Sequence, residues 1–209
     1  MAHSTEKPHI STQIQPVGIS GGFWPFIPDH VATWSWHQTF SPDECKAIIA
    51  LAKRQDDYRG MTGGGHSRRK SRVSFLFPNE TNNWIFRRMS ETIAFTNRQF
   101  FQFEVTGFGE GLQFTEYTAP GDHYGWHTDS GVNQQVRKLS ATTLLSDPDD
   151  FDGGDFEISV TGSDDDLETM ERGQGRTVVF PSWTPHRVAP VTRGTRYSLV
   201  AWVTGPPFK

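Results

Sequence analysis

The sequence of 209 residues contains one cysteine, Cys45, and no long apolar run. A single thiol cannot form an intrachain disulfide, and it excludes a cysteine-rich zinc site. Any metal chemistry must therefore use histidine and carboxylate ligands. Because no run of about 18 apolar residues occurs, the sequence predicts no membrane span. Residues 1–22 are polar and lack the apolar segment of a signal peptide, so we expect a cytoplasmic protein.

An excess of positive charge is also absent. The 24 acidic residues outnumber the 20 basic ones, and the formal net charge is −4. Proteins dedicated to nucleic acids or to anionic membranes carry a basic surplus. We therefore expect neither a nucleic acid nor a membrane as partner. The apolar fraction of 34% is enough to build one sizeable core.

The N-terminal half predicts an arm, two helices and a loop. Residues 1–28 are rich in Pro, Gly, Ser and Thr and predict a flexible arm, which leaves residues 29–209 as a single domain. Ser41 and the proline that follows it are typical of a helix start and predict a helix over residues 42–53. Apolar residues recur at helical spacing over residues 81–100. Between the helices, the glycine-rich basic loop 60–72 is either a lid over a substrate or a solvated run of charge.

From about residue 103 onward, short apolar runs alternate with turn signals at roughly ten-residue spacing. This pattern after two helices predicts an α+β fold, with a double-stranded β-helix (jelly-roll) core over about residues 103–205 and supporting N-terminal helices. The predicted strands cover residues 112–117, 138–145, 155–160, 176–180, 186–190 and 196–203.

Candidate metal ligands lie in the second half of the chain. His127 and Asp129 are two residues apart, so in an extended segment both side chains project from one face. His186, at the start of a predicted strand, supplies a second imidazole. Two imidazoles and one carboxylate leave three open positions, which suits iron(II), whereas zinc more often takes a closed tetrahedron. A motif as short as His-x-Asp also occurs by chance, and these residues could instead be turn, surface and core residues.

Arg196 lies ten residues after His186 in a segment that is apolar on both faces. A turn at residues 190–194 predicts a hairpin in which His186 and Arg196 are opposite each other on adjacent antiparallel strands. A buried charge is costly unless it is paired. We therefore expect Arg196 to bind a carboxylate through two parallel hydrogen bonds.

Four groups of residues follow one another in the second half of the chain: Gly-Asp-His-Tyr-Gly-Trp-His-Thr-Asp at 121–129, residues 139–148, Gly-Gly-Asp at 153–155, and residues 180–196. In this order they resemble the prolyl 4-hydroxylase-like 2-oxoglutarate- and Fe(II)-dependent dioxygenases, of the compact bacterial or viral type. The resemblance covers about residues 107–207, and the N-terminal half is similar only in general layout.

The resemblance implies that the chain hydroxylates a C–H bond with O2, releasing succinate and CO2, with ascorbate as reductant. It implies no catalytic residue beyond the metal centre. A peptidyl residue such as proline is the leading substrate. A free amino acid or small metabolite as substrate, and a non-catalytic jelly-roll metal-binding module, remain as alternatives. The implied roles are Fe(II) binding by His127, Asp129 and His186, binding of 2-oxoglutarate by Arg196, and lining of its pocket by Tyr117 and Thr143.

Overall fold

The computed structural model describes residues 34–54, 61–62, 68–130 and 136–207. The predicted arm, residues 1–28, and the centre of the basic loop, residues 63–67, lie outside the described residues. The flexible arm and the lid therefore stay predictions. Two parts of the predicted loop are strands, β2 (Met61–Thr62) and β3 (Arg69–Lys70).

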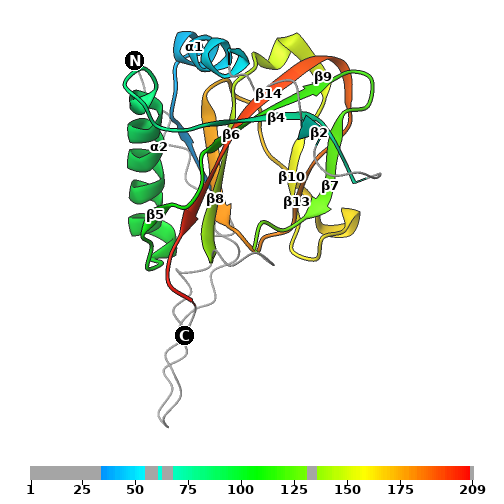
Figure 1. The fold of residues 1–209 in the computed structure, drawn as a ribbon. Helices are drawn as coiled ribbons and strands as arrows, with labels where there is room; N and C mark the ends of the chain where they lie inside the picture. Colours follow the sequence, from blue (N-terminus) through cyan, green and yellow to red (C-terminus); the bar gives the residue numbers. More distant parts are fainter. Residues whose placement is uncertain (1–33, 55–60, 63–67, 131–135, 208–209) are drawn as a thin grey trace, which may run out of the picture.

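Two antiparallel sheets form the framework of the described residues, and they face each other in Figure 1. The larger sheet runs β1 (Ser35–Gln38), β12 (Arg176–Pro181), β8 (Arg137–Leu144), β14 (Val191–Thr204), β6 (Leu112–Thr118), β4 (Arg72–Leu76) and β2, with β5 (Gly107–Phe108) and β9 (Phe151–Gly153) paired to β14. The smaller sheet runs β11 (Glu168–Thr169), β10 (Phe156–Ile158), β13 (His186–Val188), β7 (His123–His127) and β3.

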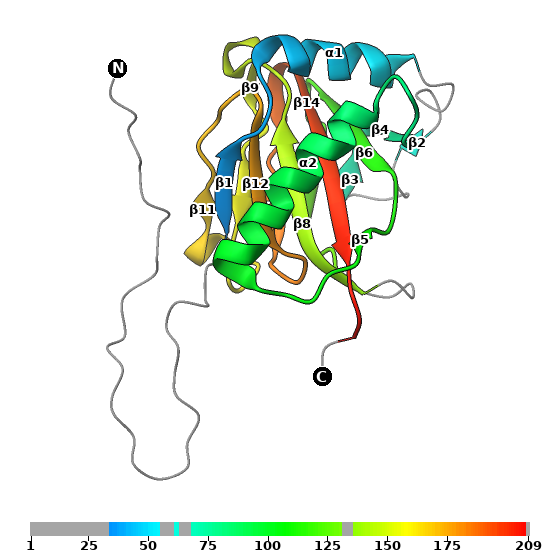
Figure 2. The same ribbon diagram turned by 90° about the vertical axis from the view of Figure 1, so that its left-hand side faces the viewer.

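Two helices cover the larger sheet on the side away from the smaller one (Figures 1 and 2). Helix α1 (Pro42–Lys53) has the predicted bounds, because a capping box fixes its start. The Ser41 hydroxyl accepts a hydrogen bond from the Glu44 backbone N–H, and the Glu44 carboxylate accepts one from the Ser41 backbone N–H. Helix α2 (Asn83–Thr96) continues as a π-helical turn, Asn97–Phe101. It buries Ile85, Met89 and Ile93, so its apolar side packs on the sheet.

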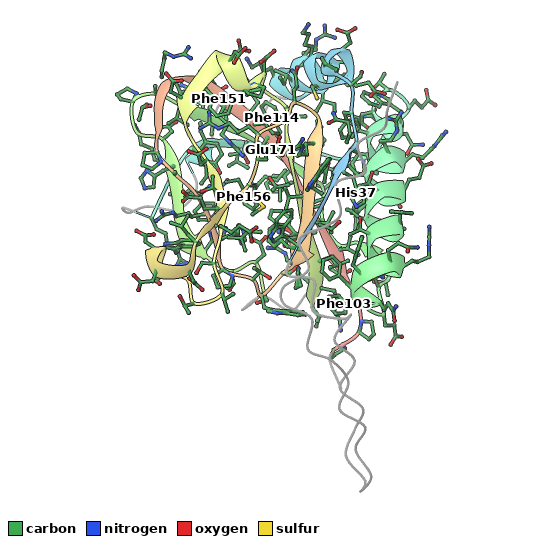
Figure 3. All side chains as sticks on the ribbon, turned by 180° about the vertical axis from the view of Figure 1, so that it is seen from behind. His37, Phe103, Phe114, Phe151, Phe156 and Glu171 are labelled. Atoms are coloured by element: carbon green, nitrogen blue, oxygen red, sulfur yellow. The ribbon has the colours of Figure 1, made fainter. Side chains whose placement is uncertain are left out.

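Side-chain alternation along β14 separates two cores. Leu199 and Ala201 point into the helix-facing core, whereas Ser198, Val200 and Trp202 line a cavity between the sheets. A second apolar cluster fills the rest of the space between the sheets, and Phe156 belongs to it (Figure 3). The α+β jelly-roll prediction is thus confirmed, with the cavity inside the double sheet.

The predicted hairpin between His186 and Arg196 is wrong. Strand β13 pairs with β10 and β7 in the smaller sheet, whereas β14 pairs with β6, β8 and β9. The chain therefore crosses from one sheet to the other between Val188 and Val191. The side chains of His186 and Arg196 reach the interior from opposite sheets. None of the described helices is long and apolar enough to cross a membrane.

The central position of β14 generates a prediction about stability. Leu199 is fully buried in the helix-facing core, so Leu199→Ala should lower the free energy of unfolding by about 2–5 kcal/mol, through lost burial and the cavity left behind. Urea denaturation measures this change. Val160→Ala is the control, since Val160 is 75% exposed and should change the free energy by less than about 0.5 kcal/mol. Equal effects of the two variants would contradict the assigned core.

Candidate metal centre

A cavity of about 240 Å³ lies between the two sheets and is lined from both of them. The larger sheet contributes residues of β6, β8, β12 and β14, and the smaller sheet contributes β3, β7, β10 and β13. Its lining combines an apolar part, which includes Phe156, Phe180 and Val188, with charged and imidazole side chains. Such a cavity, largely apolar with a few convergent polar groups, is the usual form of a small-molecule site.

His127, Asp129 and His186 meet in this cavity. The antiparallel pairing of β7 with β13 places His127 directly opposite His186, and Asp129 follows β7 by two residues. His127 Nε2 lies 3.8 Å from Asp129 Oδ1, and His186 Nε2 lies 3.6 Å from Asp129 Oδ2. One potential ligand atom from each residue lies within 4.8 Å of the others. The structure thus brings together the three candidate ligands that the sequence indicated.

Backbone carbonyl groups fix both imidazoles in the form that a metal ion needs. His127 Nδ1 lies 2.9 Å from the Gly125 carbonyl oxygen, and His186 Nδ1 lies 3.0 Å from that of Thr184. A carbonyl oxygen only accepts, so each Nδ1 carries the proton and donates it. The lone pair is then on Nε2, the atom of each ring that faces Asp129. Such hydrogen bonds to the distal ring nitrogen are typical of metal-binding histidines.

The Asp129 carboxylate is held by Ser140 of β8, whose hydroxyl donates to Oδ2 at 2.7 Å. Burial raises the pKa of Asp129, but the neighbouring His186 and His127 hold it below its usual value. Burial, together with His186, lowers the pKa of His127 to about 3. At neutral pH the site therefore offers a charged carboxylate and a neutral His127 imidazole, the protonation states that bind a metal ion. The role of Ser140 has no local sequence signal, because it depends on how β8 packs beside Asp129.

Arg196 is buried beside Tyr117, its register partner on β6. The guanidinium carbon lies 5.6 Å from the centre of the Tyr117 ring. Burial lowers the pKa of Arg196, and its Nη1 has no hydrogen-bond partner among the described residues. An unsatisfied buried donor of a charged group costs at least about 1–3 kcal/mol. A carboxylate that entered from the adjacent cavity would remove this cost, so the donor set fits the expected dicarboxylate.

The prediction for Thr143 is wrong, while Tyr117 does line the cavity. Thr143 points to the helix side of β8, where its hydroxyl lies 2.6 Å from that of Thr177 and 3.6 Å from the Met89 sulfur. The neighbouring Thr142 lines the cavity instead, because successive side chains of a strand alternate between its faces.

Tyr124, which the sequence favours as a core or rim residue rather than a site residue, lines the cavity. Its ring stacks on that of His127, with 3.5 Å between ring centres and 17° between planes. It lies three residues before His127 on β7, and the bulge between β7 and β13 brings it to the cavity. An aromatic residue in a strand is more often part of the core, so position alone could not identify it.

Most of the residues that line this cavity lie in a segment that matches a known family. Residues 112–204 match the model of the 2OG-Fe(II) oxygenase superfamily. This segment is therefore similar to 2OG-Fe(II) oxygenases. It contains the three candidate metal ligands together with Tyr117 and Arg196. The predicted resemblance to this family is therefore confirmed.

Curated relatives with the same segment are PKHD-type hydroxylases. One from Stutzerimonas stutzeri (strain A1501) is 40% identical over 97 residues, which cover 43% of this chain and 41% of that protein. Another from Synechococcus sp. (strain CC9605) is 38% identical over 87 residues, which cover 41% of this chain and 38% of that protein. The chain thus matches about two fifths of the length of these relatives.

Solved structures share the fold over most of the chain. A Pseudomonas putida prolyl-4-hydroxylase has a TM-score of 0.67 at 24% identity, covering 85% of this chain and 95% of its own. The viral collagen prolyl hydroxylase of Paramecium Bursaria Chlorella virus-1, in its 2OG complex, has a TM-score of 0.66 at 17% identity, covering 85% and 99%. At these identities the likeness establishes the jelly-roll fold.

The geometry of the 2-His-1-carboxylate group predicts how metal affinity should change. Asp129→Ala should abolish binding of Mn(II), and Ser140→Ala should weaken it about 10- to 100-fold, because the carboxylate then loses the hydrogen bond that orients it. Calorimetric titration measures both affinities. Ser90→Ala is the matched control, since Ser90 is exposed on α2. Wild-type affinity in Ser140→Ala would contradict the orienting role.

The unpaired nitrogen of Arg196 predicts a defect in co-substrate binding. Arg196→Lys should raise the concentration of 2-oxoglutarate needed for half-saturation about tenfold or more, because lysine cannot form the two parallel hydrogen bonds. Metal affinity should stay unchanged. Arg193→Lys, on the same strand but exposed and paired with Asp152, is the control. A half-saturation value that is equal in the two variants would contradict the clamp.

Proposed function

We propose that this protein is a 2-oxoglutarate- and Fe(II)-dependent dioxygenase that hydroxylates a C–H bond of a peptidyl residue, with proline as the first candidate. Succinate and CO2 are released as co-products. The observation that carries the proposal is the combination, in one inter-sheet space, of the two-histidine, one-carboxylate group with a buried arginine whose Nη1 lacks a partner. A protein that only binds a metal has no need of a carboxylate clamp beside it.

His127, Asp129 and His186 would bind Fe(II), Arg196 would bind one carboxylate of 2-oxoglutarate, and Tyr117 would line its pocket. Together with O2, this centre supplies the oxidising power of the reaction. The chain contributes geometry and shielding. Carbonyl hydrogen bonds orient the imidazoles, Ser140 orients the carboxylate, and apolar side chains such as Phe156 and Phe180 keep water from the reacting atoms.

A structural neighbour that is described with a bound peptide supports a peptide or protein substrate. One neighbour, a prolyl hydroxylase from Trichoplax adhaerens, is described in complex with a hypoxia-inducible factor peptide, with a TM-score of 0.66 at 17% identity over 83% of this chain and 84% of its own. A free amino acid or small metabolite remains the second candidate, and ascorbate the expected reductant.

The test is succinate formation from 2-oxoglutarate by the purified protein with Fe(II), O2 and ascorbate. We expect succinate to rise when a proline-rich peptide is added, to fall when ascorbate is omitted, and to disappear in Asp129→Ala. Mass spectrometry of the peptide should show a gain of one oxygen atom. Stoichiometric metal binding without succinate under any of these conditions would instead support the non-catalytic metal-binding module.

A further inference from the structure

We propose that residues 23–28, Phe-Trp-Pro-Phe-Ile-Pro, dock in an apolar groove beside the turn that links β12 to β13, and that the docked segment braces the metal ligands from outside. The groove shares no lining residue with the inter-sheet cavity. The inference therefore goes beyond the proposed function and does not depend on the substrate. Three observations carry it: the groove itself, the place where the described part of the chain starts, and the composition of the segment.

The groove has a volume of about 160 Å³ and lies between the chain that leaves β10 and residues 183–185. Its apolar surface comes from Ile158, Val160, Trp183 and Pro185. Val160 is 75% exposed and Trp183 is 43% exposed, and both are among the large apolar side chains that the described residues expose. Apolar side chains that gather in one groove, rather than singly, indicate a binding surface. A cavity of about 150 Å³ accommodates benzene, so an aromatic side chain fits this groove.

The described part of the chain starts beside this groove. The indole N–H of Trp34 donates to the Glu168 carboxylate at 2.8 Å, and Glu168 lines the groove. Trp34 also packs against the apolar cluster that contains Ile158, another lining residue. Figure 2 shows β1, which follows Trp34, next to β11, the strand that carries Glu168. Residues 29–33 span up to about 18 Å when extended, so the segment before them can reach the groove.

Residues 23–28 have the composition that such a groove binds. They carry three aromatic side chains, Phe23, Trp24 and Phe26, and no charge. Full burial of one large apolar side chain stabilises a protein by about 1.5–3 kcal/mol. Pro25 and Pro28 limit the conformations of the free segment, so docking costs less conformational entropy. Proline-containing segments are a common ligand of grooves lined by aromatic residues, and Trp183 supplies the aromatic surface here.

The turn that forms one wall of the groove also holds two candidate metal ligands. The Ser182 carbonyl oxygen accepts a hydrogen bond from the Asp129 backbone N–H at 2.8 Å. The Thr184 carbonyl oxygen lies 3.0 Å from His186 Nδ1 and orients that imidazole. Residues 183–185, in the same turn, line the groove. A segment packed against them restrains the turn, and thereby restrains the orientation of Asp129 and His186.

Crosslinking between the segment and the groove tests docking in the full chain. Ile27→Cys combined with Val160→Cys places one thiol in the segment and one at the exposed rim of the groove, and a bismaleimide joins thiols that lie close together. Cys45 does not compete, because it is fully buried and burial raises the pKa of its thiol to about 12. Docking raises the effective concentration of the two thiols, so this pair should crosslink about tenfold faster than Ile27→Cys with Ser90→Cys, at a second apolar hollow beside α2.

The control for tethering keeps both thiols and removes two aromatic side chains of the segment. With Trp24→Ala and Phe26→Ala added, crosslinking to Val160→Cys should fall to about the rate for Ser90→Cys. Equal rates at the two positions while the aromatic residues are intact, or a rate that the alanine substitutions leave unchanged, would overturn docking. A product that joins two chains would assign the groove to a second copy of the protein, and it would overturn the proposal as well.

Metal affinity tests the brace separately. Without the added cysteines, Trp24→Ala with Phe26→Ala should weaken Mn(II) binding about 3- to 10-fold in a calorimetric titration, less than the loss of a direct hydrogen-bond partner of a metal ligand. Ile10→Ala with Ile14→Ala changes apolar residues of the same arm outside the segment, and it should leave the affinity at the wild-type value. Unchanged Mn(II) affinity in the first variant would overturn the brace. Neither measurement involves turnover, so its failure leaves the proposed function standing.

Discussion

The antiparallel pairing of β7 with β13 is the constraint on which the rest of the site depends. It places His127 opposite His186, and the chain that leaves β7 brings Asp129 against both imidazoles. The backbone carbonyls of Gly125 and Thr184 then set the tautomer of each ring. A shift of one residue in this pairing would turn one imidazole to the outer face of the smaller sheet, because side chains alternate along a strand.

The larger sheet carries the main apolar core and the polar side chains that complete the site. Its helix-facing side carries the main apolar core, which holds β8 and β14 in fixed register. Its inner side presents Ser140 to Asp129, and Tyr117 and Arg196 to the space beside the cavity. The candidate metal ligands therefore come from one sheet or its edge, whereas the carboxylate clamp comes from the other. The two halves of the site meet only because the sheets pack face to face (Figure 1).

Local patterns in the sequence correctly predicted the features that depend on interactions between residues close together in the chain. Helix α1 has its predicted bounds because a capping box and a proline fix its start. The spacing of His127 and Asp129 predicted that the two side chains meet, and they do, because both residues lie at the end of one extended segment. The hairpin between His186 and Arg196 failed for the opposite reason. Spacing along the chain indicates a turn, but it does not say whether the next strand stays in the same sheet, and here β14 joins the other one.

The remaining differences also come from contacts between distant segments. Thr143 and Thr142 are indistinguishable by residue type, and only the burial of Met89 against β8 shows which of them faces the helices. Ser140 and Tyr124 gain their places from strand register. Both lie in segments that carry the family resemblance, but the sequence assigned neither of them to the site. The family resemblance carried the assignment of Arg196, whereas the structure supplied its physical reason, an unsatisfied buried nitrogen.

The space between the sheets holds the candidate metal ligands and, beside them, a buried arginine that can bind a dicarboxylate. The most direct test is to measure the affinity for 2-oxoglutarate in the metal-free protein and in the protein saturated with Mn(II). If the two ligands share this space, the metal should tighten 2-oxoglutarate binding by about tenfold or more, and 2-oxoglutarate should tighten Mn(II) binding by the same factor, because linkage between two ligands is reciprocal. Equal affinities with and without the metal would contradict a shared site.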